Sequence, residues 1–255
     1  MAGEEEHVLA GTRVLDLSRD LSGPYTAMML AELGADVVKV EHPDGGDESR
    51  SWPPRLDDIG GYFATVNRSK RSIAVDLKLP AGLEVALDLA RGADVVLQSF
   101  TPGTAERLGL GYDAVRALNP AVVYYSLSGY GQDGPWRTRR GYDPILQATS
   151  GHMSVMGEAG RGPVKSMVPI ADVATAVHGT AAILAALVRV ARTGRGQHVD
   201  MAMLDVMVSM TTVVAGRYLL TGEVPERQGT ENPQRVPSAA FRCADGRYLQ
   251  VVPNQ

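Results

Sequence analysis

The sequence predicts a protein of the α/β class, and three observations predict it. Short apolar runs recur up to residue 129, a helical pattern follows most of them, and Pro24 and Gly34 stand where the first helix would begin and end. Strands that alternate with helices form a parallel sheet, because each helix carries the chain back to start the next strand. We therefore expect a Rossmann-like open parallel sheet with helices on both faces.

The alternation starts with an apolar run at TRVLDLS (12–18), a helix over GPYTAMMLAELGAD (23–36) and a strand at DVVKVE (36–41). Further strands are expected at three places, SIAVDL (72–77), DVVLQS (94–99) and AVVYYSLSG (121–129). Between them lie three helical patterns, LPAGLEVALDLARGA (79–93), TAERLGL (104–110) and GYDAVRALN (111–119). This order continues the pattern of a parallel sheet as far as residue 129.

Beyond residue 140 the pattern changes, and helices are expected to dominate from Pro144 to Leu220 with hardly a strand among them. HMSVMGEAGRGPVKSM (152–167) is expected to be one of these helical segments. The apolar run Val168–Val190 is long enough to span a membrane, but Pro169 and Asp172 interrupt it and Ala and Gly dominate it. We expect it to be a helix packed within the protein.

The last part of the sequence predicts a hairpin. SAAFRCA and RYLQVV are β-prone runs joined at Asp245-Gly246, and Asp-Gly between such runs is a strong hairpin signal. The polar stretch TGEVPERQGTENPQRVP (221–237) precedes them, and the sequence stops abruptly at YLQVVPNQ. We expect a large domain over residues 1–221, including the long helices, and the beginning of a smaller, truncated domain over residues 222–255.

Composition and charge argue against several classes of protein. A net charge of −4 gives no basic field for nucleic acid. The lone Cys243 excludes an intrachain disulfide or a cysteine-built metal site, and it predicts a reducing, cytoplasmic setting. The five histidines are scattered, so no metal site is expected. The acidic start MAGEEEH does not resemble a secretory signal, and no membrane attachment is expected.

Cations and loops near the predicted strand ends suggest a ligand crevice. Lys78 and Arg107 each fall just beyond predicted strands, at the edge where open α/β sheets bind ligands, and loop cations there can hold phosphates. Ser99-Phe100-Thr101 follows a strand directly, so its backbone is expected to line the same crevice. The first strand leads into DLSRDLSGPYTA, which lacks GxGxxG, so a dinucleotide is not the expected ligand.

Asp172 lies where an otherwise apolar helix of small residues is expected to begin, in VPIADVATAVHG (168–179). A carboxylate near a helix start can cap backbone N–H groups, which contributes about 1 kcal/mol. The same geometry is expected to keep the carboxylate ionised through the helix dipole, and the small neighbours Ala171 and Ala174 leave it accessible to a bulky electrophile. The residues alone leave both interpretations open, a helix cap or a reagent.

Five segments cover nearly the whole chain in a characteristic order. They read VLDLSRDLSGPYTAMMLAELGADVVKVEHPDGGD, NRSKRSIAVDLK, SFTPGTAERLGLGYD, SLSGYGQDGPWRTRRGYDPILQATSG and ADVATAVHGTAAILAALVRVARTGRGQHVDMAMLD. Together they resemble the class III coenzyme A transferases of the CaiB/BaiF type, a family that includes formyl-CoA and carnitine-CoA transferases and 2-methylacyl-CoA racemases. The resemblance implies an interlocked homodimer that takes acyl-CoA and a free carboxylic acid as substrates, with coenzyme A as the carried group and no metal.

The resemblance places the catalytic aspartate on Asp172. It implies contacts to CoA at the ends of several strands and in the loops that follow them, namely at Leu21, Ser22, His42, Val75, Asp76, Leu77, Lys78, Ser99, Phe100, Thr101, Arg107, Arg140, Gly141, Tyr142 and Asp143. Among these, Arg107 and Arg140 suit the phosphate end of CoA, and the loop segments suit its adenine and pantetheine. The segment 152–167, with Met153, Met156 and Met167, is expected to shape the acyl pocket together with the smaller domain.

The implied mechanism is double displacement through an aspartyl anhydride and an aspartyl-CoA thioester. Two alternatives stay open. In the racemase branch a His–Asp pair removes an α-proton, whereas Tyr142 precedes Asp143 here, and a phenol with an ordinary pKa of about 10 is a poor base at neutral pH. The other alternative is a truncated CoA-binding protein without turnover. A chain that ends at Gln255 is also open to two further interpretations, a need for another polypeptide to complete the fold or a fragment of a longer gene product.

Overall fold

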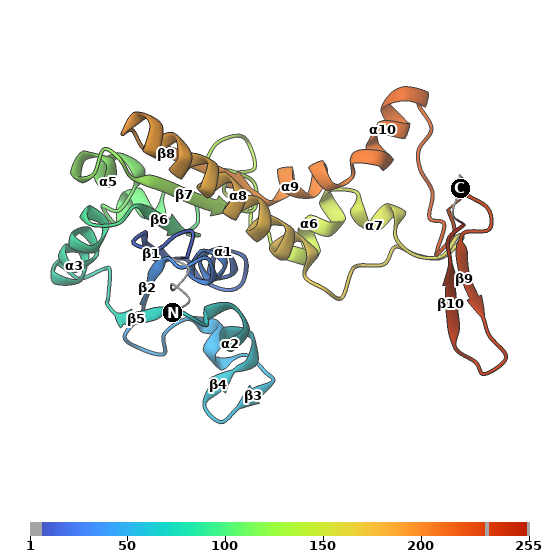
Figure 1. Cartoon of the computed structure of the whole chain (residues 1–255), viewed down its shortest axis with the longest axis horizontal. Helices are drawn as coiled ribbons and strands as arrows, with labels where there is room; N and C mark the ends of the chain where they lie inside the picture. Colours follow the sequence, from blue (N-terminus) through green and yellow to red (C-terminus); the bar gives the residue numbers. More distant parts are fainter. Residues whose placement is uncertain (1–6, 233–234, 254–255) are drawn as a thin grey trace, which may run out of the picture.

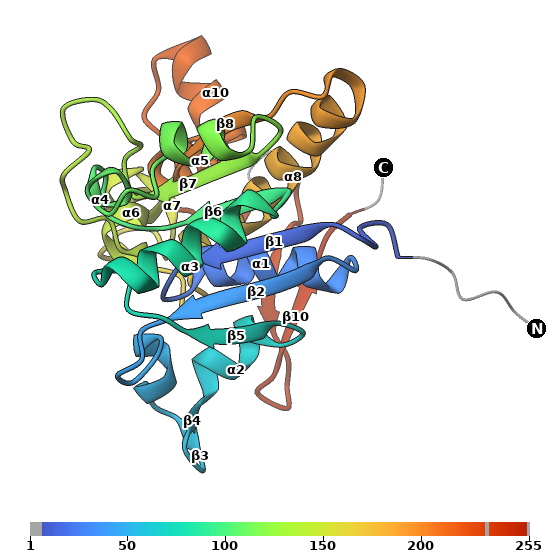
Figure 2. The ribbon, with the colours of Figure 1, turned by 90° about the vertical axis from the view of Figure 1, so that its left-hand side faces the viewer.

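The computed structural model describes residues 7–232 and 235–253. Within these residues six strands form one sheet in the order β5-β2-β1-β6-β7-β8, and every neighbouring pair is parallel (Figure 2). The strands are β1 (Arg13–Leu17), β2 (Asp36–Glu41), β5 (Arg71–Ala74), β6 (Val95–Gln98), β7 (Val123–Ser128) and β8 (Gln197–Ala202). The predicted open parallel sheet is therefore confirmed.

Helices follow most of these strands and return the chain to the opposite edge of the sheet. Those around the sheet are α1 (Ser22–Glu32), α2 (Gly61–Asn67), α3 (Pro80–Arg91), α4 (Thr104–Arg107), α5 (Tyr112–Leu118), α6 (Asp143–Thr149), α8 (Ile170–Thr193) and α9 (Met203–Met210). Their ends follow from local chemistry, since Pro80 begins α3 with a backbone already fixed for a helix. Gly194 ends α8 in the left-handed region, at φ 67°, which glycine adopts without strain.

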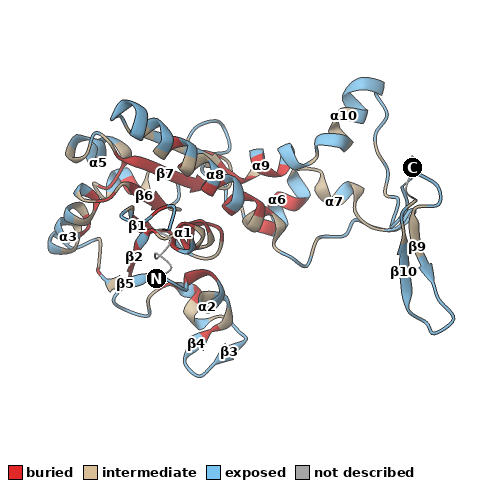
Figure 3. Ribbon diagram, in the orientation of Figure 1, coloured by how far each residue is buried: buried red, intermediate tan, exposed pale blue. Residues whose placement is uncertain are grey.

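The sheet is buried between two apolar layers, as Figure 3 shows by the buried residues along its strands. On one face α1, α8 and α9 cover a core that includes Val95, Leu97 and Tyr125 from the sheet. On the other face α3 and α5 cover a second core around Val96 and Tyr124. Successive residues of a strand point to opposite faces, so β6 contributes alternately to the two cores.

The helix α8 is long and apolar enough, by length and composition, to cross a membrane. It packs instead along the sheet, where residues such as Ala171, Ile183 and Ala186 are buried against α1 and β7. The predicted packed helix at 168–190 is thus confirmed, with its start at Ile170. A helix in a protein core can be as long and as apolar as a helix that spans a membrane.

Two elements differ from the sequence prediction. The strand β8 was not expected, because it is a half-exposed edge strand that carries the polar residues His198 and Asp200. Val199 and Met201 alternate with these polar residues, and that alternation is the signal that would have found it. The expectation of a helix over 152–167 is wrong, because α7 covers only His152–Val155 and the chain then runs without helix to Ile170.

The remaining elements lie at the margins of the sheet. After β2 the chain forms the 3₁₀ helix η1 (Glu48–Ser51) and a small antiparallel pair, β3 (Arg55–Leu56) and β4 (Ile59–Gly60). The helix α10 (Thr212–Thr221) leads away to the antiparallel hairpin of β9 (Ala239–Arg242) and β10 (Tyr248–Val251), far from the sheet (Figure 1). The predicted hairpin is confirmed, and the domain boundary at residue 222 stays a prediction.

Close packing of α8 on the sheet requires a glycine at position 179. A Cβ atom there would collide with the phenol of Tyr125, whose side chain is fully buried and has no room to move. We expect Gly179→Ala to lower the free energy of unfolding by about 1–3 kcal/mol through overpacking.

Gly216 in α10 provides the matched control, because a Cβ there meets nothing within 4 Å. Gly216→Ala is expected to leave stability unchanged or raise it by up to about 1 kcal/mol, as alanine is the better helix former. Urea unfolding of the two variants measures both effects. Equal stability of the two variants would contradict this account of the α8 packing.

Candidate active site

A large cavity opens at the carboxyl edge of the sheet and has a volume of about 930 Å³. Its walls come from the turn after β1, the loop after β6, the long loop after β7 and the start of α8. From β1 the chain moves to β2 and β5 on one side, whereas β6 lies on the other side. The cavity thus lies at the point where the strand order reverses, which is the usual ligand crevice of open α/β sheets. We call it the cleft.

Asp172 is the third residue of α8, lines the cleft and is partly buried. Burial, together with the negative charges of Asp143 and Asp20, raises the pKa of Asp172 to about 7. Near neutral pH the carboxyl is therefore about half protonated. A carboxyl with such a pKa in a cleft is a common property of catalytic sites.

The two sequence-based interpretations of Asp172 can now be compared with the geometry. Pro169 occupies the N-cap position of α8 and makes no side-chain cap hydrogen bond. The expectation that N–H donors and the helix dipole keep Asp172 ionised is wrong. The nearby N–H of Ala171 donates to Asp143 instead, and burial together with the charges of Asp143 and Asp20 raises the pKa of Asp172.

Two hydrogen bonds hold the backbone at the start of α8. The Ser22 hydroxyl donates to the carbonyl oxygen of Asp172 at 3.0 Å, so α1 contacts α8 directly at this residue. The N–H of Ala171 donates to Oδ1 of Asp143 at 2.8 Å. Asp172 thus extends from a backbone that is fixed on both sides.

Basic and acidic side chains both line the cleft. Five basic side chains line it, and we call them the cleft cations: Arg19, Arg137, Arg139, Arg140 and Lys165. Arg19 lies over the ring of Phe100 at 5.6 Å, and Arg139 lies over Trp136 at 4.4 Å. These stacked guanidinium groups suit phosphate or carboxylate ligands.

The structure brings ten of the sixteen predicted site residues together in the cleft lining: Leu21, Ser22, Ser99, Phe100, Thr101, Arg140, Gly141, Tyr142, Asp143 and Asp172. The other six predicted site residues lie outside the lining of the cleft: His42, Val75, Asp76, Leu77, Lys78 and Arg107. They follow β2 and β5 or lie in α4, at the same edge of the sheet. The side chain of Val75 is buried in the core, and Arg107 donates to Thr104 beside it.

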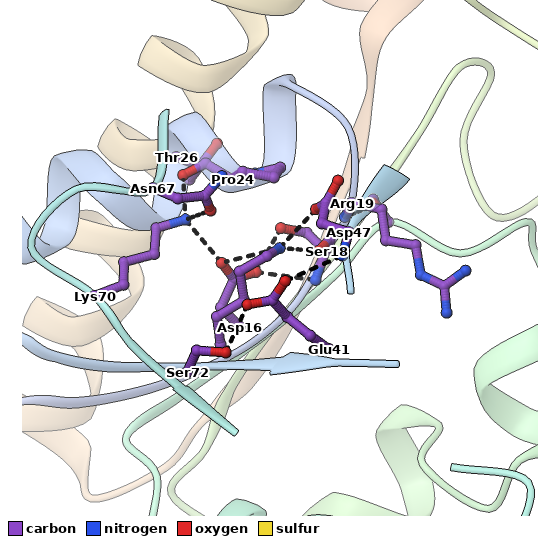
Figure 4. Close-up of polar contacts among 12 residues, drawn as sticks. Asp16, Ser18, Arg19, Pro24, Thr26, Glu41, Asp47, Asn67, Lys70 and Ser72 are labelled. Atoms are coloured by element: carbon purple, nitrogen blue, oxygen red, sulfur yellow. Dashed lines mark hydrogen bonds and ion pairs between the residues drawn. The ribbon is translucent and has the colours of Figure 1, made fainter. Parts of the chain in front are cut away.

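A cluster of buried charged side chains contacts the turn after β1 (Figure 4). Lys39 is almost fully buried, and its ammonium donates to the carbonyl of Ser18 at 2.6 Å and pairs with Asp47 at 3.0 Å. Lys70 pairs with the fully buried Asp16 at 2.9 Å. Burial acts to raise the pKa of Asp16, but the two lysines outweigh it and hold this pKa below its usual value.

This cluster fixes the segment that reaches the cleft. Asp16 also accepts from the N–H of Ser18, whose carbonyl accepts from Lys39. Both backbone polar groups of Ser18 are therefore hydrogen-bonded to the cluster. The turn continues through Asp20, in the left-handed region at φ 68°, to Ser22 and its bond with Asp172. Figure 4 shows the Arg19 side chain pointing away from the cluster, which leaves its guanidinium free to face the cleft.

A chain of polar side chains supports the loop after β6 in a similar way. Gln98 is buried at the end of β6 and accepts from the N–H of Phe100 at 2.7 Å. Its amide donates to Ser126 in β7, and the Ser126 hydroxyl contacts Nε2 of His198 in β8 at 2.8 Å. The position of Phe100 therefore depends on hydrogen bonds across three strands.

Sequence reasoning missed several residues that line the cleft, including Arg19, Asp20 and Lys165. Arg19 and Asp20 follow β1 directly, and their position at a strand end was the available signal. Lys165 lies in the segment 152–167, which was expected to shape the acyl pocket, but the methionines of that segment were named and Lys165 was not. Of the three methionines expected at the acyl pocket, Met167 lines the cleft. Across the described residues, no cluster of three or more His, Cys, Asp or Glu side chains could hold a metal ion.

Comparison with known proteins identifies related chains. Residues 9–255 match the model of CoA-transferase family III. A succinate–glutarate CoA-transferase of Agrobacterium fabrum is 42% identical over 253 residues, which cover 96% of this chain and 63% of that protein. A human succinyl-CoA:glutarate CoA-transferase is 39% identical over 244 residues, which cover 95% of this chain and 56% of that protein. The chain spans about three fifths of the length of these curated relatives.

A solved structure has the same fold. The crystal structure of a CaiB/BaiF family protein from Brucella suis superposes with a TM-score of 0.92 at 38% identity. The match covers 97% of this chain and 66% of that one. The fold described above is therefore that of this solved structure over nearly all of the chain.

The buried ion cluster makes a prediction about stability. We expect Lys39→Met to lower the free energy of unfolding by about 3–5 kcal/mol, because Asp47 would stay buried without its cation. Arg68→Met is the control, since Arg68 pairs with Glu32 on the surface, where such pairs contribute at most about 1 kcal/mol. Urea unfolding at neutral pH measures both variants, and similar losses in the two would show that the cluster has no special role.

Proposed function

Because this chain belongs to CoA-transferase family III, we propose that it transfers CoA from an acyl-CoA donor to a free carboxylic acid, with Asp172 as the nucleophile. The observation that supports this most directly is the placement of Asp172. Its carboxyl lines a cleft of about 930 Å³, large enough for an acyl-pantetheine group, beside five cations. A carboxylate held against a thioester in such a site acts as a covalent catalyst.

The first half of the proposed reaction moves CoA onto the protein. A carboxylate oxygen of Asp172 attacks the carbonyl carbon of the donor thioester, and the C–S bond breaks to give a mixed anhydride and free CoA thiolate. The thiolate then attacks the Asp172 carbonyl carbon of the anhydride. The donor leaves as a carboxylate, and an aspartyl-CoA thioester remains.

The second half reverses these steps with another acid. The acceptor carboxylate attacks the carbonyl carbon of the aspartyl thioester and releases the CoA thiolate, which forms a second mixed anhydride. The thiolate attacks the acceptor's carbonyl carbon, so the new acyl-CoA leaves and the Asp172 carboxylate is restored. Each step exchanges one acyl bond for another, so no oxidant, metal or net proton transfer is required.

The environment of Asp172 suits this role. A carboxylate with a pKa of about 7 is a stronger nucleophile than an ordinary aspartate, although only about half of it is ionised at neutral pH. In the proposal the phosphates of CoA face cleft cations such as Arg140. The pantetheine arm follows Ser99–Thr101 and Gly141–Tyr142 toward Asp172. Contacts from His42, from residues 75–78 and from Arg107 stay predictions for the adenine end.

We further propose that the acids are dicarboxylates. The related Agrobacterium and human proteins carry names that pair succinate or succinyl-CoA with glutarate. Here Lys165 lines the cleft on the segment that leads into α8, together with Met167 and Pro169. A cation in that position can pair with a second carboxylate while methylene groups contact Met167.

The role of Asp172 predicts a covalent intermediate. With acyl-CoA and hydroxylamine present, we expect a hydroxamate at Asp172, found by peptide mass spectrometry and absent without acyl-CoA. Asp172→Ala is expected to lower kcat by about 10⁴-fold or more while CoA binding persists, because the nucleophile alone is lost.

Two outcomes would contradict this prediction. One is a turning-over enzyme from which hydroxylamine traps nothing at Asp172. The other is exchange of the α-hydrogen of a 2-methylacyl-CoA for deuterium without acyl transfer, which would indicate a racemase.

The proposed substrate class predicts a preference between acids of matched length. We expect glutarate to be used as acceptor at least about 10-fold better, in kcat/KM, than pentanoate, which lacks the second carboxylate. Lys165→Met is expected to reduce this preference, whereas Arg68→Met, on a different surface, leaves it unchanged. Equal kcat/KM values for glutarate and pentanoate would exclude recognition of a second carboxylate.

A further inference from the structure

Both carboxylate oxygens of Asp143 accept hydrogen bonds from the protein. Asp143 begins α6, and its residue is 8% exposed. Oδ1 accepts from the N–H of Ala171 at 2.8 Å, and Oδ2 accepts from the side-chain amide of Gln147 at 2.7 Å. One side chain therefore joins the start of α6 to the residue that directly precedes Asp172.

Gln147 extends this contact to a further wall of the cleft. Its side chain is fully buried, and its Oε1 accepts from the N–H of Ser166 at 2.8 Å. Ser166 lies between Lys165 and Met167, both of which line the cleft. The carboxylate of Asp143 thus holds the start of α8 directly and the preceding segment through Gln147.

We propose that Asp143 is a positioning residue for Asp172 rather than a ligand of CoA. Its carboxylate fixes the backbone from which Asp172 extends, and it places a negative charge beside the reacting carboxyl. This inference rests on the proposed function and adds a residue that acts through Asp172. Both oxygens of Asp143 already accept hydrogen bonds from the protein, one from α6 and one from the start of α8.

The charge of Asp143 is one of the causes of the raised pKa of Asp172. Burial is the largest cause of its raised pKa, and Asp143 and then Asp20 follow. Glu48, the phenols of Tyr62 and Tyr142 and the cleft cations also line the cleft. Removing the charge of Asp143 would therefore lower the pKa of Asp172 toward its ordinary value, and burial would keep the rest of the rise.

Asp143→Asn is the first test variant. The amide oxygen of the introduced asparagine can still accept from Ala171, but its NH₂ would face the NH₂ of Gln147. Adding Gln147→Glu resolves this conflict, because a glutamate accepts both from the introduced asparagine and from the N–H of Ser166. The double variant D143N/Q147E keeps the hydrogen bonds and moves the negative charge from residue 143 to residue 147.

The ionisation of Asp172 is measured directly by ¹³C NMR titration of labelled aspartate carboxyls, with Asp172→Asn assigning the signal. In D143N we expect its midpoint to fall by about one pH unit. The acid limb of kcat/KM should move down by the same amount. In D143N/Q147E we expect an intermediate midpoint and recovery of kcat relative to D143N. Asp88→Asn, which removes a surface carboxylate that pairs with Arg91 in α3, is expected to leave the midpoint unchanged.

Each outcome decides the proposal. An unchanged Asp172 midpoint in a folded D143N protein overturns it. Weaker binding of CoA with an unchanged midpoint also overturns it and makes Asp143 a ligand. If D143N does not fold, the midpoint of the double variant decides in its place. If the unmodified protein transfers no CoA, the proposed function fails, but the NMR titration still tests the coupling of the two carboxyls.

Discussion

The start of α8 is held between two other segments by two hydrogen bonds, and the cleft depends on them. Ser22 donates to the backbone carbonyl of Asp172, and Asp143 accepts from the N–H of Ala171. These bonds place a carboxyl in a partly desolvated position beside another carboxylate. Burying an ionised carboxyl is costly, so burial favours the protonated form and raises the pKa of Asp172. The neighbouring carboxylates of Asp143 and Asp20 raise it further.

Buried polar residues near the carboxyl ends of the strands give the cleft its rigid walls. Asp16 and Lys39 hold the turn after β1, and Gln98 holds the loop after β6. Each lies next to apolar residues of its strand, and each is at most 2% exposed. Such residues favour one arrangement of the loops, because any other arrangement would leave a buried charge or amide without its partner. Departures from the apolar strand pattern thus mark the part of the sheet that supports the site.

The sequence predicted the parallel sheet well because strands such as DVVKVE and helices such as α3 carry strong local signals. It also placed Asp172 at a helix start. It could not predict the pKa of Asp172, since this depends first on burial and then on Asp143 and Asp20, which the fold brings close from other segments. The edge strand β8 was missed because its polar residues obscured a short alternation. Residues 75–78 were placed at the correct edge of the sheet, yet they lie outside the cleft lining.

The central claim is that the Asp172 carboxyl reaches the carbonyl carbon of a bound thioester. A crystal structure with a non-hydrolysable acyl-CoA analogue measures this most directly. The account predicts the analogue's carbonyl carbon within about 3–3.5 Å of an Asp172 oxygen, with the pantetheine arm in the cleft. An analogue bound with its acyl end far from Asp172, or an Asp172 side chain turned away from the cleft in the complex, would contradict it.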